Sequence, residues 1–259
     1  SVADCYMGLK DYTAAERTPR HALRSAPPSA GTSAVREMLL VARRHLDFAT
    51  QGQLGFKDRL YIDYGAICLG SGRDDGLAIP IYQDHAFTYR DVAVTLSRLL
   101  VLIREYNWQF NALVGVDEDS TPLAIALSQL LEVPMLGVEE LREGDFVLLV
   151  LAMGIQAELC EVTLEHISGP MLSFTLALAW QPDQGLVTDI VGVSCTGKCM
   201  LPWKRIRRRS AEAAATSILR ALAVVPEDLN QLQQVAYYTQ EHKLLRFFDL
   251  SAEFLDQDT

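Results

Sequence analysis

The chain has 259 residues and a formal net charge of −10, with 49 % hydrophobic and 22 % charged residues. This composition is typical of a globular protein that buries a sizeable core without disulfides or metals, and its negative charge opposes general binding to nucleic acid or anionic membranes. The longest apolar stretches, Phe146–Ile155 and Met171–Trp180, reach about half of the roughly 20 residues that a membrane-spanning helix needs. We therefore expect buried strands there and no transmembrane segment.

The cysteines and the N-terminal composition bear on the cellular compartment. An odd number of cysteines at low density is typical of a reducing compartment; they are Cys5, Cys68, Cys160, Cys195 and Cys199. The sequence begins at Ser1, and residues 13–45 are rich in Ala, Ser and Arg. Two interpretations stay open for this stretch, an organelle-targeting segment and a flexible basic arm beside an acidic body.

The first third of the chain is predicted to be irregular before it becomes helical. Prolines and small polar residues in 1–34 indicate an extended arm with little structure of its own. An apolar stripe predicts a helix over Ser33–Ala49. Short strands are expected within the glycine-rich stretch that follows, at Leu60–Ile62 and Ala78–Tyr82. Thr88 can cap a helix that runs to Glu105.

The middle of the chain alternates between apolar strands and helices, which predicts a parallel sheet covered on both faces. Strands are expected at Ala112–Val116, Pro134–Val138, Phe146–Leu151, Met171–Trp180 and Val187–Val193, and helices at Thr121–Leu131 and Ile155–Ile167. After Pro202 the pattern predicts two amphipathic helices, Ser210–Val224 and Pro226–Phe248, and an acidic tail over Ser251–Thr259.

Three segments carry a resemblance to a known family. Leu69–Arg73, followed by Ile81–Asp84, is similar to paired L-x-S-G-R and Y-x-D motifs. Ala112–Val116, followed by Ser120–Ala124, is similar to a strand, a diphosphate-binding loop and a helix. Glu143–Val150 is similar to a G-D-x-V-L-L-V strand. In this order and spacing the segments resemble the type I phosphoribosyltransferases, particularly the orotate branch.

The resemblance covers about residues 55–205. It implies an α/β fold with a mostly parallel sheet, flanking helices and a small β-rich hood from residues 55–85. In such sheets ligands bind at the carboxyl ends of the strands. The family binds its phosphoribosyl donor there through two consecutive acids, which contact the ribose hydroxyls, and a T-T-G-type loop that cradles the 5′-phosphate.

The chain departs from the family at both donor subsites. Leu151 and Ala152 stand at the two acid positions, and the loop that follows has no Thr pair and places Glu158 where the phosphate would lie. At the diphosphate loop, Asp117–Asp119 precede Ser120, and three carboxylates repel a diphosphate. The sequence therefore predicts loss of donor binding, with no catalytic, cofactor-binding or metal-binding residues.

Two further segments offer chemistry of their own. Gly192–Cys199 nearly matches a phosphate-binding P-loop, but Cys199 replaces the hydroxyl that would hold magnesium, so a tight connection is the better interpretation. Cys195 and Cys199 lack the paired histidines or cysteines of a zinc site, which leaves two buried thiols or a redox pair. Residues 204–209 carry Lys204 and four arginines, which could contact phosphate, anionic lipid or RNA; contact with acidic groups of this chain or of a protein partner is favoured.

We divide the chain into an arm (1–34), a phosphoribosyltransferase-like domain (35–205) and a C-terminal helical extension with its tail (206–259). The favoured function is that of a non-catalytic, structural or accessory subunit of a larger protein assembly. The aromatic residues of the last helix suggest a surface for neighbouring subunits. A mitochondrial membrane complex is the expected setting, with the cytoplasm as the alternative. An active nucleobase phosphoribosyltransferase with an atypical donor site, and a regulator that senses a ligand through Ser120, Thr121 and the backbone near Gly154, remain alternatives.

Overall fold

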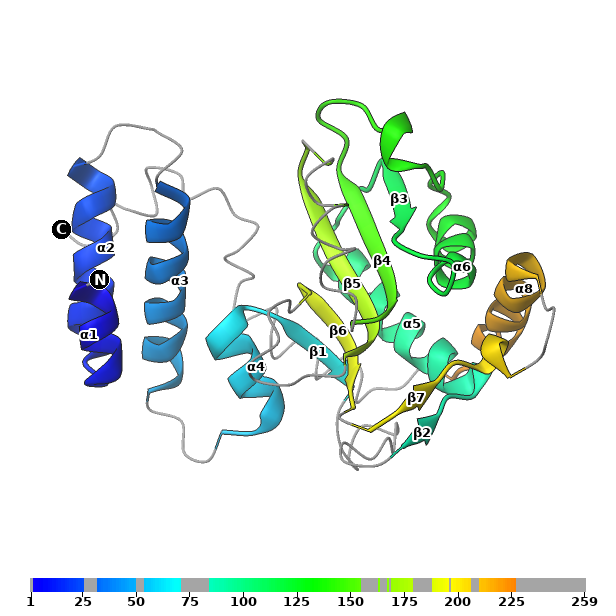
Figure 1. Ribbon diagram of the computed structural model, residues 1–259, viewed down its shortest axis with the longest axis horizontal. Coiled ribbons are helices and arrows are strands. Elements are labelled where there is room, and N and C mark those ends of the chain that lie inside the picture. Colours follow the sequence, from blue (N-terminus) through cyan, green and yellow to red (C-terminus); the bar gives the residue numbers. More distant parts are fainter. Residues whose placement is uncertain are drawn as a thin grey trace. The chain divides into compact units, whose positions relative to one another are not determined.

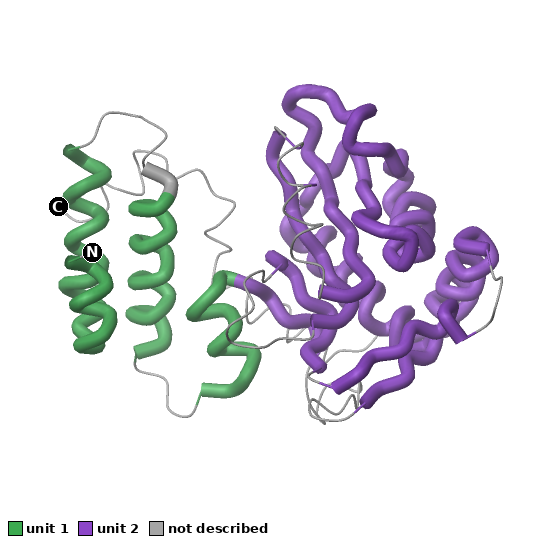
Figure 2. Tube along the Cα trace, viewed as in Figure 1, with its two compact units in different colours: residues 1–65, 237–259 green, residues 66–236 purple. Residues whose placement is uncertain are grey.

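The computed structural model describes residues 2–25, 32–49, 54–70, 84–154, 163, 167, 169–178, 188–195, 197–205 and 210–226. Within these ranges the chain divides into two compact units between Gly65 and Ala66 (Figure 2). No helix of the described residues is both long enough and apolar enough to cross a membrane. The division lies well after the predicted end of the arm at residue 34, so the expected domain boundary differs from the observed one.

The first unit is helical. Helices α1, α2 and α3 pack in sequence, and α4 packs on α3. Their bounds are Val2–Gly8 for α1, Tyr12–Ser25 for α2, Thr32–Phe48 for α3 and Phe56–Tyr64 for α4 (Figure 1). The predicted helix over Ser33–Ala49 is confirmed by α3.

The prediction of an extended arm over residues 1–34 is wrong, because α1 and α2 lie within it. Pro19, one of the prolines that indicated an extended arm, lies buried inside α2 together with Ala15. Most helical stability in proteins comes from packing of one apolar face, and α2 obtains it against α3. An ion pair between Glu16 and Arg20, one turn apart, adds local support.

The predicted strand over Leu60–Ile62 is also wrong, because these residues lie in α4. The helix begins where the Asp58 carboxylate accepts a hydrogen bond from the Gly55 N–H at 2.8 Å. It ends at Gly65, whose φ of 70° lies in the left-handed region, and whose N–H donates to the Tyr61 carbonyl. A Cβ at Gly65 would come within 2.9 Å of the Arg44 guanidinium, so only glycine fits this turn. The two end signals outweigh the strand propensity of the apolar residues between them.

The second unit contains a parallel five-stranded sheet in the order β1-β6-β5-β4-β3, which confirms the predicted α/β class. The strands are β1 (Ile67–Gly70), β3 (Ala112–Gly115), β4 (Val147–Met153), β5 (Met171–Leu178) and β6 (Ile190–Ser194). Residues from Val147 to Ala152 are all buried, as expected for a parallel strand with both faces covered. A small second sheet pairs β2 (His85–Ala86) with β7 (Cys199–Met200), whereas the β-rich hood predicted over 55–85 instead holds α4 and β1 in its described part.

The helices of this unit follow the predictions closely. They are α5 (Tyr89–Glu105), α6 (Thr121–Leu131) and α8 (Ala211–Leu222), with short 3₁₀ turns at Val138–Glu140 and Pro202–Lys204. Thr88 caps α5 as predicted, since its hydroxyl oxygen accepts the Asp91 N–H at 3.2 Å. Helix α8 packs against both α5 and α6, so this part of the expected C-terminal extension belongs to the α/β unit.

One predicted strand is reduced to a bridge, and several other predicted elements lie outside the described residues. The strand expected over Pro134–Val138 is reduced to a single bridge between Met135 and Leu113, because Pro134 has no N–H to donate and a 3₁₀ turn begins at Val138. The strand at Ala78–Tyr82, the helix at Pro226–Phe248 and the acidic tail lie outside the described residues, as does nearly all of the helix at Ile155–Ile167.

A pH dependence is expected in the first unit. The His45 ring stacks on Tyr12 with ring centroids 4.6 Å apart. Burial, partly offset by the Asp63 carboxylate, lowers the pKa of His45 below its ordinary value of 6.5. The folded unit therefore binds fewer protons than the unfolded chain, and its stability falls as the pH drops through about 6.5.

The prediction is tested by thermal unfolding at pH 7.5 and pH 5.5, followed by the hydrogen exchange of α3 amides. A His45→Phe variant keeps an aromatic ring against Tyr12 and should lose less protection than the wild type on acidification. An equal loss in both proteins would contradict the assignment to His45.

Candidate functional site

The carboxyl edge of the sheet contains a topological switch point between β3 and β4. These two strands pair directly, with Val114 opposite Leu149. After β3 the chain passes through α6 and returns to the outer side of β3 at Met135, whereas after β4 it continues to β5 on the other side. Where connections of neighbouring strands diverge in this way, a crevice opens that is the usual ligand site of such sheets.

One side of this crevice is closed by the cap of α6. The Asp117 carboxylate accepts the Ser120 N–H at 2.7 Å and a short hydrogen bond from the Ser120 hydroxyl. The Thr121 hydroxyl donates to the Asp117 carbonyl at 3.1 Å. A helix N-terminus attracts anions through its free N–H groups and its dipole. Here the Asp117 carboxylate of the chain itself accepts the Ser120 N–H, immediately before α6 begins.

Ser120 also ties the loop to the neighbouring strand. Its hydroxyl oxygen accepts the Ala152 N–H at 2.8 Å, and both residues are fully buried. The hydroxyl thus receives a hydrogen bond from β4 and donates one to Asp117. Backbone donors on both sides of the crevice are therefore already used within the protein.

The positions compared with the two ribose-binding acids lie inside β4. Leu151 is 2 % exposed and packs in an apolar cluster with Val114 and Leu149. Ala152 is fully buried, and the strand continues to Met153. Glu158, expected near the phosphate position, lies outside the described residues.

The acidic loop is held from the other side by the segment after β7. The Trp203 indole N–H donates to the Asp119 carbonyl at 3.1 Å, and the Lys204 ammonium forms an ion pair with the Asp119 carboxylate. The hydrogen bond to Asp119, together with the charges of Glu118 and Asp117, raises the pKa of Lys204. The first cation of the basic run 204–209 is thus neutralised by an acid of this chain, as the favoured interpretation expected; residues 206–209 are not described.

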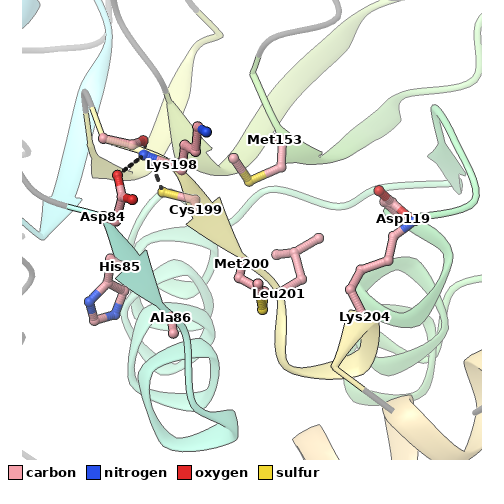
Figure 3. Close-up of a pocket in the computed structure, with 11 residues that line it drawn as sticks. Asp84, His85, Ala86, Asp119, Met153, Lys198, Cys199, Met200, Leu201 and Lys204 are labelled. Carbon is pink, nitrogen blue, oxygen red and sulfur yellow. Dashed lines mark hydrogen bonds and ion pairs between the residues drawn. The ribbon is translucent and has the colours of Figure 1, made fainter. Parts of the chain in front are cut away.

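A pocket of about 680 Å³ lies at this edge of the sheet (Figure 3). One wall is the β2–β7 sheet, and the other includes Met153 at the end of β4 and Asp119 from the acidic loop. The Asp84 carboxylate accepts the Lys198 N–H at 2.8 Å and joins the segments before β2 and β7. The lining is made up of Asp84, His85, Ala86, Asp119, Met153, Gly197, Lys198, Cys199, Met200, Leu201 and Lys204.

The residues that line the pocket do not include those expected for a ligand sensor, which were Ser120, Thr121 and the backbone near Gly154. Ser120 and Thr121 are engaged with Asp117, and the Gly154 N–H donates to the Ala177 carbonyl at 2.9 Å. The pocket could not be predicted from the sequence, because its walls come from segments far apart in the chain. The one available signal was the Gly197-Lys198-Cys199 run after β6, interpreted as a tight connection; strand β7 and a 3₁₀ turn follow it instead of a P-loop helix.

Among the described residues, no group of three or more His, Cys, Asp or Glu side chains is arranged to hold a metal ion. Cys195 is fully buried and Cys199 is partly buried, both as free thiols.

No protein-family model matches the chain, and no curated protein has a matching sequence. Its fold is similar to that of several solved structures. A purine phosphoribosyltransferase from Pyrococcus horikoshii is 17 % identical over 49 % of this chain and 99 % of its own, with a TM-score of 0.41. A hypothetical protein from Neisseria gonorrhoeae with bound ppGpp is 13 % identical over 56 % of this chain and 98 % of its own, with a TM-score of 0.42.

The xanthine-guanine-hypoxanthine phosphoribosyltransferase of Helicobacter pylori is 13 % identical over 48 % of this chain and 92 % of its own, with a TM-score of 0.38. Two of these three structures are thus phosphoribosyltransferases, the family that the sequence segments resemble. Identities and TM-scores this low concern the fold alone and leave the activity of this chain open.

The Ser120 bridge yields a stability prediction. A Ser120→Ala variant leaves the buried Ala152 N–H without its acceptor, which should lower the free energy of unfolding by about 1–3 kcal/mol. Urea unfolding measures this change. Thr216→Ala, which removes an exposed hydroxyl bonded within its own helix, should change the free energy by no more than about 0.5 kcal/mol. Equal changes in the free energy of unfolding for the two variants would contradict a stabilising role of the Ser120–Ala152 hydrogen bond.

Proposed function

We propose that this chain is a non-catalytic phosphoribosyltransferase-like protein that serves as an accessory subunit of a larger protein assembly. The observation that carries the proposal is the set of hydrogen bonds at the carboxyl ends of β3 and β4, where Ser120 links Asp117 to the Ala152 N–H. A phosphoribosyl donor bound there would have to displace these internal hydrogen bonds.

The chemistry at this edge opposes a phosphorylated ligand in two further ways. The residues compared with the ribose-binding acids, Leu151 and Ala152, are buried and have no polar side-chain atoms. The loop that would face a diphosphate carries Asp117, Glu118 and Asp119, and among the described residues Lys204 forms an ion pair with Asp119. Like charges at contact distance repel strongly in a partly buried site. Both features support loss of the donor site.

The helical first unit supports the accessory role. It is a compact body of its own before the α/β unit begins. Near its N-terminal end this unit exposes two large apolar side chains, Val2 at the start of α1 (62 %) and Leu9 in the turn after α1 (76 %). Single exposed apolar residues are common, but two at the two ends of one short helix offer a protein partner an apolar contact.

The compartment belongs to the same proposal. A basic, acid-poor N-terminal composition is typical of organelle import, so we place the assembly in the mitochondrion, at a membrane complex, with the cytoplasm as the alternative. The partners would be protein subunits, and the basic run 204–209 could add a contact with anionic lipid or phosphate. The net charge of −10 opposes a role on nucleic acid.

A second candidate function rests on the pocket beside the crevice. A concave, largely apolar space with a few polar groups is the usual form of a small-molecule site, and here Asp84, His85 and Lys198 supply those groups. The chain would then be a regulator that senses a ligand without transforming it.

The loss of donor binding is tested by calorimetric titration of the full chain with phosphoribosyl pyrophosphate and Mg²⁺. We expect no heat of binding at millimolar donor, because Leu151 and Ala152 offer no carboxylate to the ribose and the acids Asp117–Asp119 repel a diphosphate. An active type I phosphoribosyltransferase in the same buffer serves as the control.

Micromolar donor binding would overturn the proposal and favour an active transferase, to be followed by a screen of nucleobases. A purine nucleotide that raises the melting temperature without turnover would instead favour the sensor, since a ligand that binds the folded state stabilises it by mass action.

The accessory role is tested by the native size of the tagged chain in extracts of cells that express it naturally. We expect the wild type to migrate within an assembly, and a Val2→Ser/Leu9→Asp variant to be released from it. Val224→Asp, at a residue 80 % exposed in the other unit, is the matched control and should remain bound. Migration of the wild-type chain as a free monomer would contradict the accessory role.

A further inference from the structure

The segment after β6 brings two thiols to one acceptor. The Cys195 Sγ donates to the Gly197 carbonyl oxygen at 3.7 Å, and the Cys199 Sγ donates to the same oxygen at 3.9 Å. The Cys195 side chain also interacts directly with that of Cys199, which contributes to the raised pKa of the Cys199 thiol. Both sulfurs therefore lie within reach of one carbonyl oxygen and of each other.

The surroundings of the pair disfavour charge. Cys195 is fully buried, and Cys199 packs with Met153 against an apolar cluster that contains Phe87. Burial, the hydrogen bond with Cys195 and the nearby Asp84 carboxylate raise the pKa of the Cys199 thiol to about 12. A metal bound by two thiolates would need further ligands, and the described residues offer no cluster of three. A neutral product of the two thiols fits this environment better than a charged one.

We propose that Cys195 and Cys199 form an intramolecular disulfide when the protein meets a small-molecule disulfide such as oxidised glutathione. The Cys199 sulfur attacks first, because it lines the pocket, whereas Cys195 is sealed in the core. The S–S bond of the small molecule breaks, a mixed disulfide forms on Cys199, and one small thiolate leaves. The Cys195 sulfur then attacks the Cys199 sulfur and expels the second thiolate.

The exchange is balanced. The two protein thiols are oxidised, the small-molecule disulfide is reduced to two thiols, and the two thiol protons of the protein pass to the released thiolates. A disulfide carries no charge, so it avoids the conflict between a Cys199 thiolate and Asp84. A high thiol pKa slows the first attack but also makes the thiolate a poor leaving group, which resists reversal.

The position of the pair connects this chemistry to the pocket. Residues 197–201 all line the pocket, and β7 within this stretch pairs with β2, with His85 opposite Cys199. A Cys195–Cys199 disulfide would join the end of β6 directly to this second sheet. It would thereby restrain one whole wall of the pocket, whether the pocket binds a ligand or a segment of a partner.

The test uses the full chain equilibrated with oxidised glutathione, alkylated, and digested with trypsin without reduction. Trypsin cleaves after Lys198, so Cys195 and Cys199 fall on different peptides unless a disulfide joins them. Mass spectrometry should find the Cys199 peptide linked to the peptide that ends at Lys198. Reduction with dithiothreitol should separate the two.

Cys160 provides the matched control, because no Lys or Arg separates it from Cys195 in the sequence and both lie on one tryptic peptide. Cys160→Ser should keep the cross-link, and Cys195→Ser should lose it. Wild-type Cys199 found as a free thiol, or only as a stable glutathione adduct, would overturn the proposal. Loss of the cross-link in Cys160→Ser, with retention in Cys195→Ser, would assign the partner to Cys160 and overturn it equally.

Discussion

The buried hydroxyl of Ser120 is the group on which the carboxyl edge of the sheet depends. A parallel sheet ends in backbone N–H groups that have no further strand partners, and a buried donor must find an acceptor. Ser120 accepts the Ala152 N–H from β4 and passes the hydrogen bonding on to Asp117 at the start of α6. The Ser120 side chain thus accepts a hydrogen bond from the strand β4 and donates one to Asp117, which precedes the helix α6.

The acidic loop Asp117–Asp119 is held by contacts with other parts of this chain. Asp117 accepts hydrogen bonds from the Ser120 N–H and hydroxyl, and Asp119 forms an ion pair with the lysine of the Trp203–Lys204 segment. These two carboxylates therefore act as structural partners of this chain's own donors. Internal contacts thus account for Asp117 and Asp119 in the acidic loop.

The sequence predicted those parts of the structure that depend on local patterns. Apolar runs located β4 and β5, and Thr88 and Thr121 marked the starts of α5 and α6, because caps and burial on both faces leave direct traces in the sequence. Helix α2 was missed, since Pro19 is tolerated only through packing on α3. The pocket was missed because Asp84, Met153 and Lys198 meet only through the topology, and the thiol pair was recognised without its shared acceptor, Gly197. Leu151 and Ala152 continue the buried apolar run of β4, whereas the role of Ser120 depends on its contact with a residue in another strand and leaves no local pattern.

The position of β1 in the sheet has a consequence for biosynthesis. Among the described residues β1 pairs with β6 alone, with Ile67 opposite Ile190, so its partner is made long after β1 itself has left the ribosome. Pairing between segments so distant in sequence is slow, because the entropy of closing the intervening chain is lost before the contact forms. Until β6 arrives, the apolar strand Ile67–Gly70 remains without its hydrogen-bonding partner, the kind of surface that chaperones recognise and that aggregates during synthesis. The closing of the sheet at β1 is therefore the step at which the newly made chain most needs protection.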